Sequence, residues 1–196
     1  MRQLTKKNEP MNSLFDYFEQ FMPLSTDAKA LIAITAEYVE FPKNAQILIA
    51  GNHNKQMYVI KKGIVRGYKI NDKGEDITLS LWMENDTFGD ITTYIMGSPL
   101  KKSYEALEDI SAYSININQF RELFAVSNEI CNLGRLIIEF YVVKTEIFKD
   151  SLRDSTAQER LQFLMTHRPS LVSRVKLKYI ASFLDISSET LSRLRQ

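Results

Sequence analysis

The sequence predicts an α+β fold in which a small antiparallel β-barrel or jelly roll is followed by a long helix and a C-terminal helix-turn-helix. Short β-rich runs separated by turn residues lie between residues 41 and 117. Apolar residues of helical period follow between 128 and 152, and two more helical stripes fill the last twenty residues. We expect three parts, at residues 1–127, 128–152 and 153–196. With 196 residues, 44% of them hydrophobic, the chain can bury a sizeable core.

The N-terminal stretch from Met11 to about Val39 has a helical pattern. Apolar residues recur on one face at Leu14, Phe15, Phe18, Phe21 and Met22. Ser25 precedes a second short amphipathic stretch, as a helix N-cap does. The pattern predicts packing helices.

The segment from Phe41 to Ile117 changes to the period of β-strands. Its six β-rich runs are QILIA, MYVIKK, IVRGYKI, DITLSLW, KSYEAL and SAYSINI. They are separated by turn signals at Gly51-Asn52, Gly63, 71–74 and 84–86. Short strands at this interval are typical of a small antiparallel barrel or jelly roll. Trp82 is expected to pack in its core rather than to stack on a ligand.

The predicted helix from Asn128 to about Leu152 is long for a domain of this size, at roughly 37 Å by its rise per residue. Apolar residues outside its main stripe would stay exposed if it packed only on its own barrel. These residues are Leu136, Ile138, Val142 and Val143. They favour a dimer seam, with a simple connecting helix as the alternative. Gly134 could allow close helix approach, and Cys131 is expected to be a buried helix residue.

The C-terminal segment begins with a predicted capping box of Ser155 and Gln158, which starts a helix over 157–166 that Arg168-Pro169 ends. Residues 177–196 then predict a helix, a turn and a second helix. Asp185 stands at the turn, where a left-handed backbone is needed, and Ser187 is the expected N-cap. The expected buried stripe consists of Leu177, Ile180, Ala181, Leu184, Leu191 and Leu194, with Ile186 at the corner, while Lys176, Lys178 and Ser182 stay outside.

The outer face of the last helix carries side chains that suit base edges and phosphates. These are Ser188, Glu189, Ser192, Arg193 and Arg195. Arg193 could donate two hydrogen bonds to guanine, and Glu189 could accept one from cytosine or complement the helix dipole. From Thr156 onward there are seven Lys and Arg against three Asp and Glu, a local excess that phosphate contacts require. An ordinary helical hairpin with a solvated face is the alternative.

The sequence lacks the residues that several functional classes require. There is one cysteine, and His53 and His167 lie far apart, so no metal site is expected. Neither a catalytic motif nor the metal ligands of a cupin-type enzyme are present, and we expect no enzyme and no cofactor. The N-terminus has no apolar leader segment, and no apolar run approaches about eighteen residues. We therefore expect a cytoplasmic protein without membrane attachment.

The order of these elements resembles that of the Crp/Fnr family of bacterial transcription regulators. The glycines at 51, 63, 74 and 89 match turns of the family's cyclic-nucleotide-binding fold, and SSETLSRLR is similar to its recognition helix. The resemblance implies a winged helix-turn-helix, a homodimer on double-stranded DNA and a surface for RNA polymerase. It places Ser188, Glu189 and Arg193 at base-reading positions and Thr190 and Ser192 at phosphates; we add Lys178 as a DNA-contacting cation.

The effector pocket departs from the family's pattern for binding cyclic nucleotides. The entry 88–91 is Phe-Gly-Asp-Ile, with Asp90 in place of glutamate after Gly89. Gap-free counting from Gly89 puts Leu100 at the position of the phosphate-binding arginine, followed by Lys101. A lysine lacks the planar fork that holds a phosphate through two bonds. The degenerate pocket thus comprises Gly89, Asp90, Ile91, Thr92, Leu100 and Lys101, and we predict that it does not sense cyclic AMP. It could bind another effector or serve as a rigid scaffold.

The function predicted from the sequence is a dimeric, sequence-specific DNA-binding transcription regulator. The alternative is a dimeric regulatory module whose basic C-terminus binds another protein.

Overall fold

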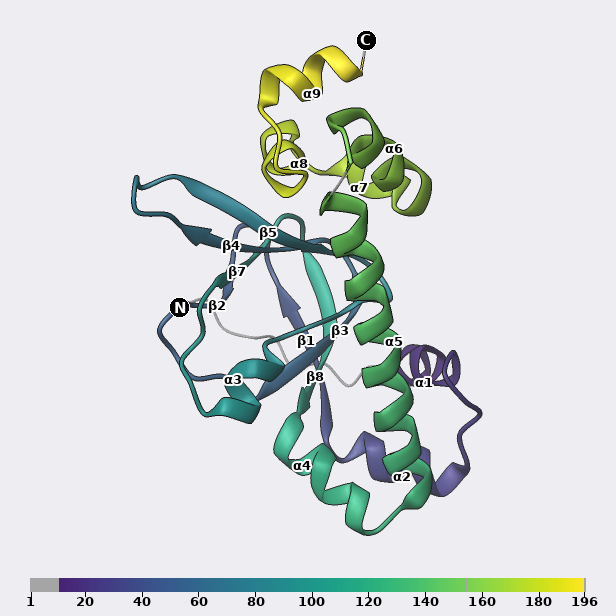
Figure 1. Cartoon of the computed structure of the whole chain (residues 1–196). Helices are drawn as coiled ribbons and strands as arrows, with labels where there is room; N and C mark the ends of the chain where they lie inside the picture. Colours follow the sequence, from purple (N-terminus) through teal and green to yellow (C-terminus); the bar gives the residue numbers. More distant parts are fainter. Residues whose placement is uncertain (1–10, 154, 196) are drawn as a thin grey trace.

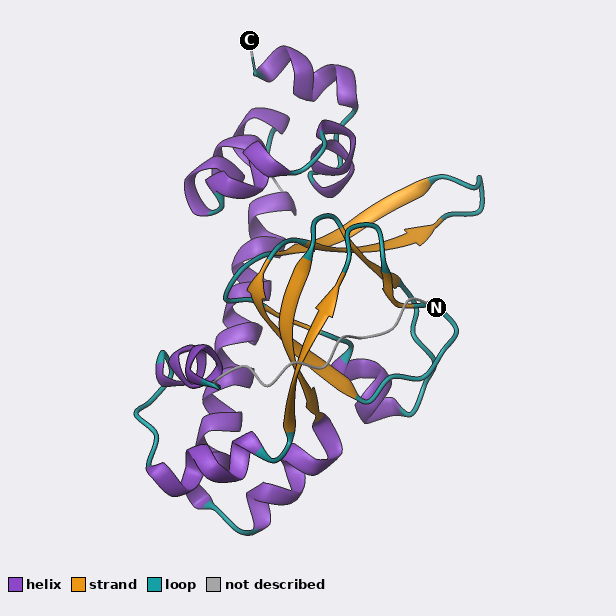
Figure 2. Cartoon of the chain, turned by 180° about the vertical axis from the view of Figure 1, so that it is seen from behind, coloured by secondary structure: helices purple, strands orange, loops and turns teal. Residues whose placement is uncertain are grey.

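The computed structural model describes residues 11–153 and 155–195. A β-barrel lies at the centre, a long helix runs along one side of it, and the C-terminal helices sit at one end (Figures 1 and 2). The helices are α1 (Asn12–Glu19), α2 (Thr26–Ala33), α3 (Ile91–Met96), α4 (Ile117–Glu122), α5 (Asn128–Arg153), α6 (Ala157–His167), α7 (Pro169–Arg174), α8 (Leu177–Phe183) and α9 (Ser188–Leu194), with a 3-10 turn, η1, at Leu123–Ala125. The strands are β1 (Ala36–Phe41), β2 (Gln46–Leu48), β3 (Gln56–Lys62), β4 (Val65–Ile70), β5 (Asp76–Trp82), β6 (Thr87–Phe88), β7 (Ser103–Ala106) and β8 (Ile110–Asn116).

Two four-stranded antiparallel sheets form the barrel. One has the order β1-β8-β3-β6 and the other β2-β7-β4-β5, so each sheet combines strands that are distant in the chain. The first sheet is held by the pairing of Tyr113 with both Tyr38 and Val59. This arrangement confirms the predicted α+β class with an antiparallel barrel. The expected turns are also present, since Gly51, Gly63 and Gly74 have positive φ.

The inside of the barrel is filled with aromatic rings. Tyr58 stacks on Phe88 with 4.7 Å between ring centroids, and Trp82 stacks on Tyr104 at 5.3 Å. Phe41 closes the cluster with its edge toward Tyr58. Trp82 therefore packs in the core, as predicted. Aromatic pairs of this kind add about 0.5–1.5 kcal/mol beyond the area they bury.

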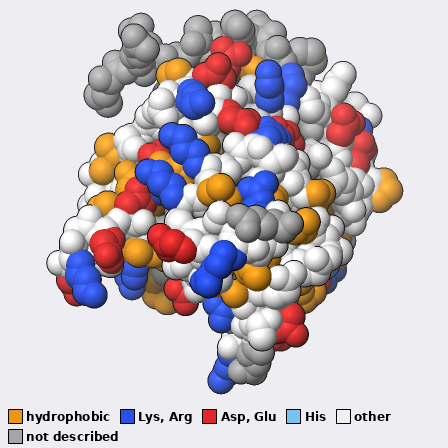
Figure 3. Space-filling model, turned by 90° about the horizontal axis from the view of Figure 1, so that it is seen from above, with side chains coloured by type: hydrophobic (Ala, Val, Ile, Leu, Met, Phe, Trp, Pro, Cys, Tyr) orange, Lys and Arg blue, Asp and Glu red, His pale blue; other side chains and the backbone are white. Residues whose placement is uncertain are grey.

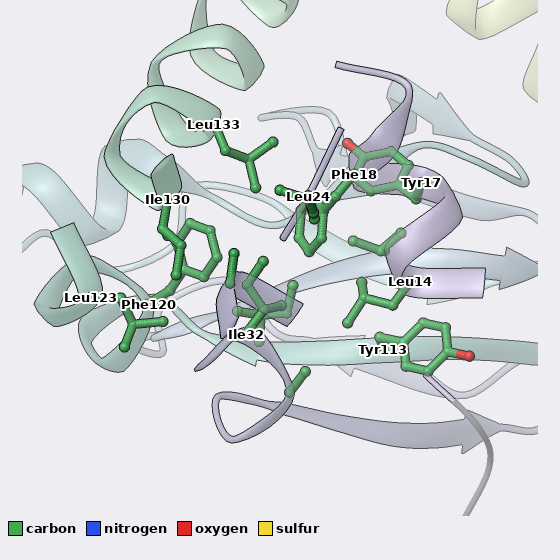
Figure 4. Packing of buried hydrophobic residues seen from close by; sticks show 14 of the residues in the cluster. Leu14, Tyr17, Phe18, Leu24, Ile32, Tyr113, Phe120, Leu123, Ile130 and Leu133 are labelled. Atoms are coloured by element: carbon green, nitrogen blue, oxygen red, sulfur yellow. The ribbon is translucent and has the colours of Figure 1, made fainter. Parts of the chain in front are cut away.

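The N-terminal helices pack between the first sheet and the start of α5. Leu14, Phe18 and Ile32 from α1 and α2 meet Ile130 and Leu133 of α5 in one buried cluster (Figure 4). The predicted helical segment extended too far, because strand β1 begins at Ala36. The residues Ala36, Tyr38 and Val39 are buried along that strand by pairing with β8, which a local helical pattern does not show.

The long helix α5 spans 26 residues and is buried mainly in its first turns. Gly134 makes room for a contact within the chain, because a Cβ atom there would lie 2.6 Å from the Phe124 ring of η1, while close approach of a second helix at this glycine stays a prediction. Cys131 is exposed, contrary to expectation. It lies two turns before Ile138 on the outward face, while the buried face begins at Ile130 and Leu133.

That outward face leaves large apolar side chains exposed along the rest of α5. They are Ile138, Phe140, Val142, Val143 and Ile147, which are 47–57% exposed. The ring of Phe140 meets Phe21 edge-on, so it is partly covered by the N-terminal segment.

The C-terminal residues 155–195 form the four helices α6 to α9, and none of them is in a strand. The capping box of α6 lies one residue later than predicted, at Thr156 and Glu159 instead of Ser155 and Gln158. The Glu159 carboxylate accepts the Thr156 backbone N–H at 2.7 Å, and a charged acceptor makes a stronger cap than an amide. Pro169 ends this helix and starts α7.

The C-terminal helices share a core with the barrel. Ile64 and Leu81 of the barrel lie in one buried cluster with Leu161, Leu171 and Ile180. The helix-turn-helix is therefore held against the barrel and does not hang from the end of α5 alone.

Candidate nucleic-acid interface and effector pocket

The helix-turn-helix forms as the residue pattern predicts. Asp185 has φ of 53°, the left-handed backbone that the turn requires. Ser187 caps α9 by accepting the Thr190 backbone N–H at 3.0 Å. Arg160 of α6 donates to the carbonyl of Leu184 at 3.1 Å, which satisfies the C-terminal end of α8. The turn is thus fixed from both sides.

The outer face of α9 is open to solvent. Ser188, Glu189, Ser192 and Arg193 are exposed on it. Thr190 is half-buried and its hydroxyl lies 3.0 Å from Ser187 Oγ, so this side chain belongs to the cap. Hydrogen bonds from its own backbone N–H and from Ser187, together with the charge of Arg193, lower the pKa of Glu189, which stays ionised at neutral pH.

Helix α8 differs from the prediction at two positions. Leu177 is 42% exposed, because it is the first residue of the helix and lies beyond the edge of the core. Ser182 is not outside; its hydroxyl accepts the backbone N–H of Thr78 in β5 at 2.8 Å. Lys178 is exposed as expected, with its ammonium 4.8 Å from the Tyr179 ring centroid. The face of α8 opposite the core of the C-terminal helices therefore packs on the barrel.

Several C-terminal cations are already engaged within the molecule. Arg174 pairs with Glu84 and Glu108 of the barrel at 2.8 and 2.6 Å. Hydrogen bonds from the Arg174 guanidinium lower the pKa of Glu84 to about 2, although burial of the carboxyl group by itself would raise it. The exposed cations left at this end are Lys176, Lys178, Arg193 and Arg195. Figure 3 views the molecule from this end and shows Lys and Arg interspersed with Asp and Glu.

Asp86, in the turn between β5 and β6, joins three parts of the chain. Its carboxylate receives two hydrogen bonds from Arg168, one of them at 2.9 Å, and pairs with Lys144 of α5 at 2.7 Å. Burial alone would raise the pKa of Asp86, but Arg168 and Lys144 outweigh it and lower the value. The barrel, the long helix and the start of α7 meet at this carboxylate.

The residues at the entry to the expected effector pocket make structural contacts within the chain. Gly89 has φ of 151°, and a Cβ atom there would lie 2.4 Å from the Met57 sulfur. Asp90 caps α3 by accepting the backbone N–H groups of Thr92 and Thr93 at 3.0 and 3.2 Å. Ile91 and Thr92 are exposed on the first turn of that helix. One oxygen of the Asp90 carboxylate, Oδ1, is thus engaged by the backbone of α3.

The two neighbouring residues expected at the phosphate position have different environments. Leu100 is buried in the barrel core at 3% exposure, whereas Lys101 is exposed. The lysine that faces the interior is Lys102, whose ammonium lies 5.3 Å from the Trp82 ring and 5.4 Å from the Tyr104 ring. Burial lowers its pKa, and the charge of Asp90 opposes this. The sequence signal that we missed is the alternation along β7, which puts Lys102 on the same side as the buried Tyr104 and Ala106.

None of the described helices has the length and apolar character needed to cross a membrane. The described residues hold no group of three or more His, Cys, Asp and Glu side chains placed to bind a metal ion.

Residues 38–127 match the sequence model of the cyclic nucleotide-binding domain family. The global nitrogen regulator of Synechococcus elongatus is 23% identical over 124 residues, which cover 62% of this chain and 55% of that protein. The chain thus spans about half the length of the curated relatives it matches.

Two solved structures illustrate the fold that the chain shares. FixK2 from Bradyrhizobium japonicum superposes with a TM-score of 0.66 at 20% identity, over 82% of each chain. A putative Crp/Fnr-family regulator from Eubacterium rectale gives 0.66 at 20% identity, over 91% of this chain and 85% of that one. Residues 38–127 are therefore similar to the cyclic nucleotide-binding domain family, and the chain as a whole has the fold seen in a structure of a Crp/Fnr-family regulator.

Proposed function

We propose that the chain is a dimeric, sequence-specific DNA-binding transcription regulator of the Crp/Fnr type that acts in the cytoplasm and has no enzymatic activity. In this proposal residues 1–127 form the effector part, 128–152 the dimerisation helix and 153–196 the DNA-binding part. Contact with RNA polymerase would then decide whether the protein activates or represses transcription.

The observation that carries the proposal is the contrast between the two helices of the helix-turn-helix. Helix α8 is packed between the C-terminal core and strand β5, whereas α9 keeps Ser188, Glu189 and Arg193 exposed on one face. A recognition helix in the major groove needs such a face, with a rigid partner helix behind it. Lys178 and Ser192 are also exposed, and they are proposed to contact phosphates together with the half-buried Thr190.

The exposed apolar face of α5 supports the dimer. Side chains such as Ile138, Val142 and Val143 would be covered if two copies of α5 packed together. A two-fold dimer presents its recognition helices to half-sites about 34 Å apart, one turn of DNA.

The barrel interior supports the prediction that cyclic AMP is not the effector. Leu100 cannot neutralise a phosphate, and Trp82, Phe88 and Tyr104 fill the space between the sheets. An anionic nucleotide would have to displace these rings and meet Lys102 alone. Calorimetric titration with cyclic AMP is expected to give no binding at micromolar concentrations, and micromolar affinity would contradict this part of the proposal.

The experiment for the main proposal is selection from random DNA duplexes followed by binding measurements at several salt concentrations. A DNA-binding regulator should select a near-palindromic site and lose affinity steeply as salt rises. The alternative, a module that binds another protein through its basic C-terminus, predicts no selected sequence and partner binding that changes little with salt. Absence of DNA binding at low ionic strength would reject the proposal.

A further inference from the structure

An apolar cavity of about 400 Å³ lies outside the barrel, between the first sheet, helix α3 and the first half of α5. Its walls come from α1, β3, β6, α3, β8, α4, η1 and α5, and they include Val59, Ile95, Ile115, Phe120 and Ile137. The volume falls in the range of small-molecule sites, which are mostly apolar with a few placed polar groups. This cavity is separate from the space between the sheets that the aromatic rings fill.

One cation stands among these apolar walls. Arg121 of α4 lines the cavity and is exposed, and its guanidinium donates to the hydroxyl of Tyr94 in α3 at 2.8 Å. It also lies 5.3 Å from the centroid of that ring. Within residues 11–153 and 155–195, no carboxylate pairs with Arg121, unlike Arg66, Arg168 and Arg174. A guanidinium has five N–H donors in a planar fork, and one bond to Tyr94 leaves donors free for an anion.

We propose that this cavity binds an amphipathic carboxylate with an unbranched apolar chain, such as a medium-chain fatty acid. The chain would lie against the apolar walls and the carboxylate would accept hydrogen bonds from Arg121 and the Tyr94 hydroxyl. A bidentate arginine–carboxylate pair matches the geometry of the free donors. The proposal does not depend on DNA binding by the chain.

The location places such a ligand between two elements of the fold, α3 and α5. Gly134 lines the cavity where α5 touches Phe124, and Ile91 and Ile95 line it from α3. Helix α3 has six residues and ends at Gly97, with φ of 64°. A ligand between α3 and α5 would therefore contact both elements at once.

The test is calorimetric titration of the full chain with octanoate and decanoate below their micelle concentrations, with octan-1-ol as the uncharged probe. Each added methylene should raise the affinity about fourfold, so decanoate should bind roughly 16-fold more tightly than octanoate. Octan-1-ol should bind at least about tenfold more weakly than octanoate, because it forms no charge-assisted bond with Arg121.

Variants separate the anion site from general apolar binding. Arg121→Gln should weaken decanoate binding about tenfold, and Arg121→Lys should restore part of it. Arg153→Gln removes the same charge at the far end of α5, where the side chain is exposed, and should leave binding unchanged. Thermal unfolding of each variant checks that the fold is intact, which is expected for exposed positions.

Three results would overturn the proposal. One is equal affinity for octanoate and octan-1-ol, and another is unchanged decanoate binding by Arg121→Gln. The third is an affinity that falls as the protein concentration rises, because a second copy of the chain would then occupy the cavity.

Discussion

The guanidinium of Arg66 in strand β4 lies on the ring of Tyr179 in helix α8, with 3.9 Å between Cζ and the ring centroid. The same Cζ lies 4.3 Å from the centroid of the Tyr68 ring, and the guanidinium nitrogens donate to Asp76 at 2.6 and 2.8 Å. Its Nε atom is 2.8 Å from Glu105, in an ion pair that lacks hydrogen-bond alignment. This buried arginine joins the barrel to the first helix of the helix-turn-helix.

Replacement of Tyr179 tests this joint. Tyr179→Leu keeps apolar area but removes the ring face, and we expect the free energy of unfolding to fall by about 1–2 kcal/mol, the value of a desolvated cation–π contact. Tyr179→Phe keeps the ring face, and its free energy of unfolding should fall by much less. Urea unfolding of both variants provides the measurement, and equal losses would show that the ring face is not what stabilises the contact.

Removal of the Asp86 carboxylate should destabilise the contact between barrel, α5 and α7. Asp86→Asn leaves Arg168 and Lys144 without their anion, and the expected loss is about 3 kcal/mol, the low end for a buried pair because both cations are partly exposed. The control is Lys149→Gln, which removes a lysine from an exposed ion pair on α5, the helix that also carries Lys144. It should change the free energy of unfolding by less than about 1 kcal/mol. A similar effect of both changes would contradict the role of Asp86.

The Glu84–Arg174 pair predicts a loss of stability in acid. Hydrogen bonds from Arg174 hold the pKa of Glu84 at about 2 in the folded chain, below the ordinary 4.5 of the unfolded chain. The stabilisation is therefore fully present above about pH 4.5 and is lost as the pH falls toward 2. Unfolding free energies between pH 7 and 2.5 should fall less for Glu84→Gln than for the unchanged protein. Parallel pH profiles of the two proteins would rule out this contribution.

The proposed dimer seam can be tested by cross-linking. In a Cys131→Ser background, Ile138→Cys should form a disulfide between two copies on mild oxidation, because residues on a two-fold seam face their own counterparts. Lys69→Cys, at an exposed position on β4, should stay monomeric on a denaturing gel. Equal cross-linking at both positions would indicate random collision rather than a seam.

Arg193 is the residue of α9 expected to read a base. Arg193→Ala should weaken binding to the selected duplex by about 1–3 kcal/mol and relax the preference at one base pair. Arg195→Ala should lower affinity more evenly across sequences, as loss of a phosphate contact does. Gel-shift titrations at fixed salt compare the two, and unchanged specificity of Arg193→Ala would remove it from the base-reading set.

Local patterns predicted the parts of this fold whose structure is decided locally. The left-handed turn at Asp185 and the cap at Ser187 follow from residue chemistry within a few positions. The exposure of Cys131 did not, because which side of α5 is buried depends on helices α1 and α2. Strand β1 was missed for the same reason, since its partner β8 is distant in the chain and pairs Ala36 with Ile115.

The candidate site could be predicted only in part. The exposed face of α9 was expected, whereas the engagement of Ser182, Arg168 and Arg174 with the barrel depends on how two parts of the chain meet. Lys102 was within reach of the pattern, because strand alternation alone places it beside Tyr104. Counting positions along the family's motif gave Leu100 and Lys101 instead.

The barrel interior contains the chain's single tryptophan, stacked on Tyr104 and 5.3 Å from the ammonium of Lys102. Emission from this one indole therefore reports on the barrel and on no other part of the molecule. Its intensity and wavelength can follow opening of the space between the sheets in real time, without an added dye. Any small molecule that enters there would have to disturb this optical signal.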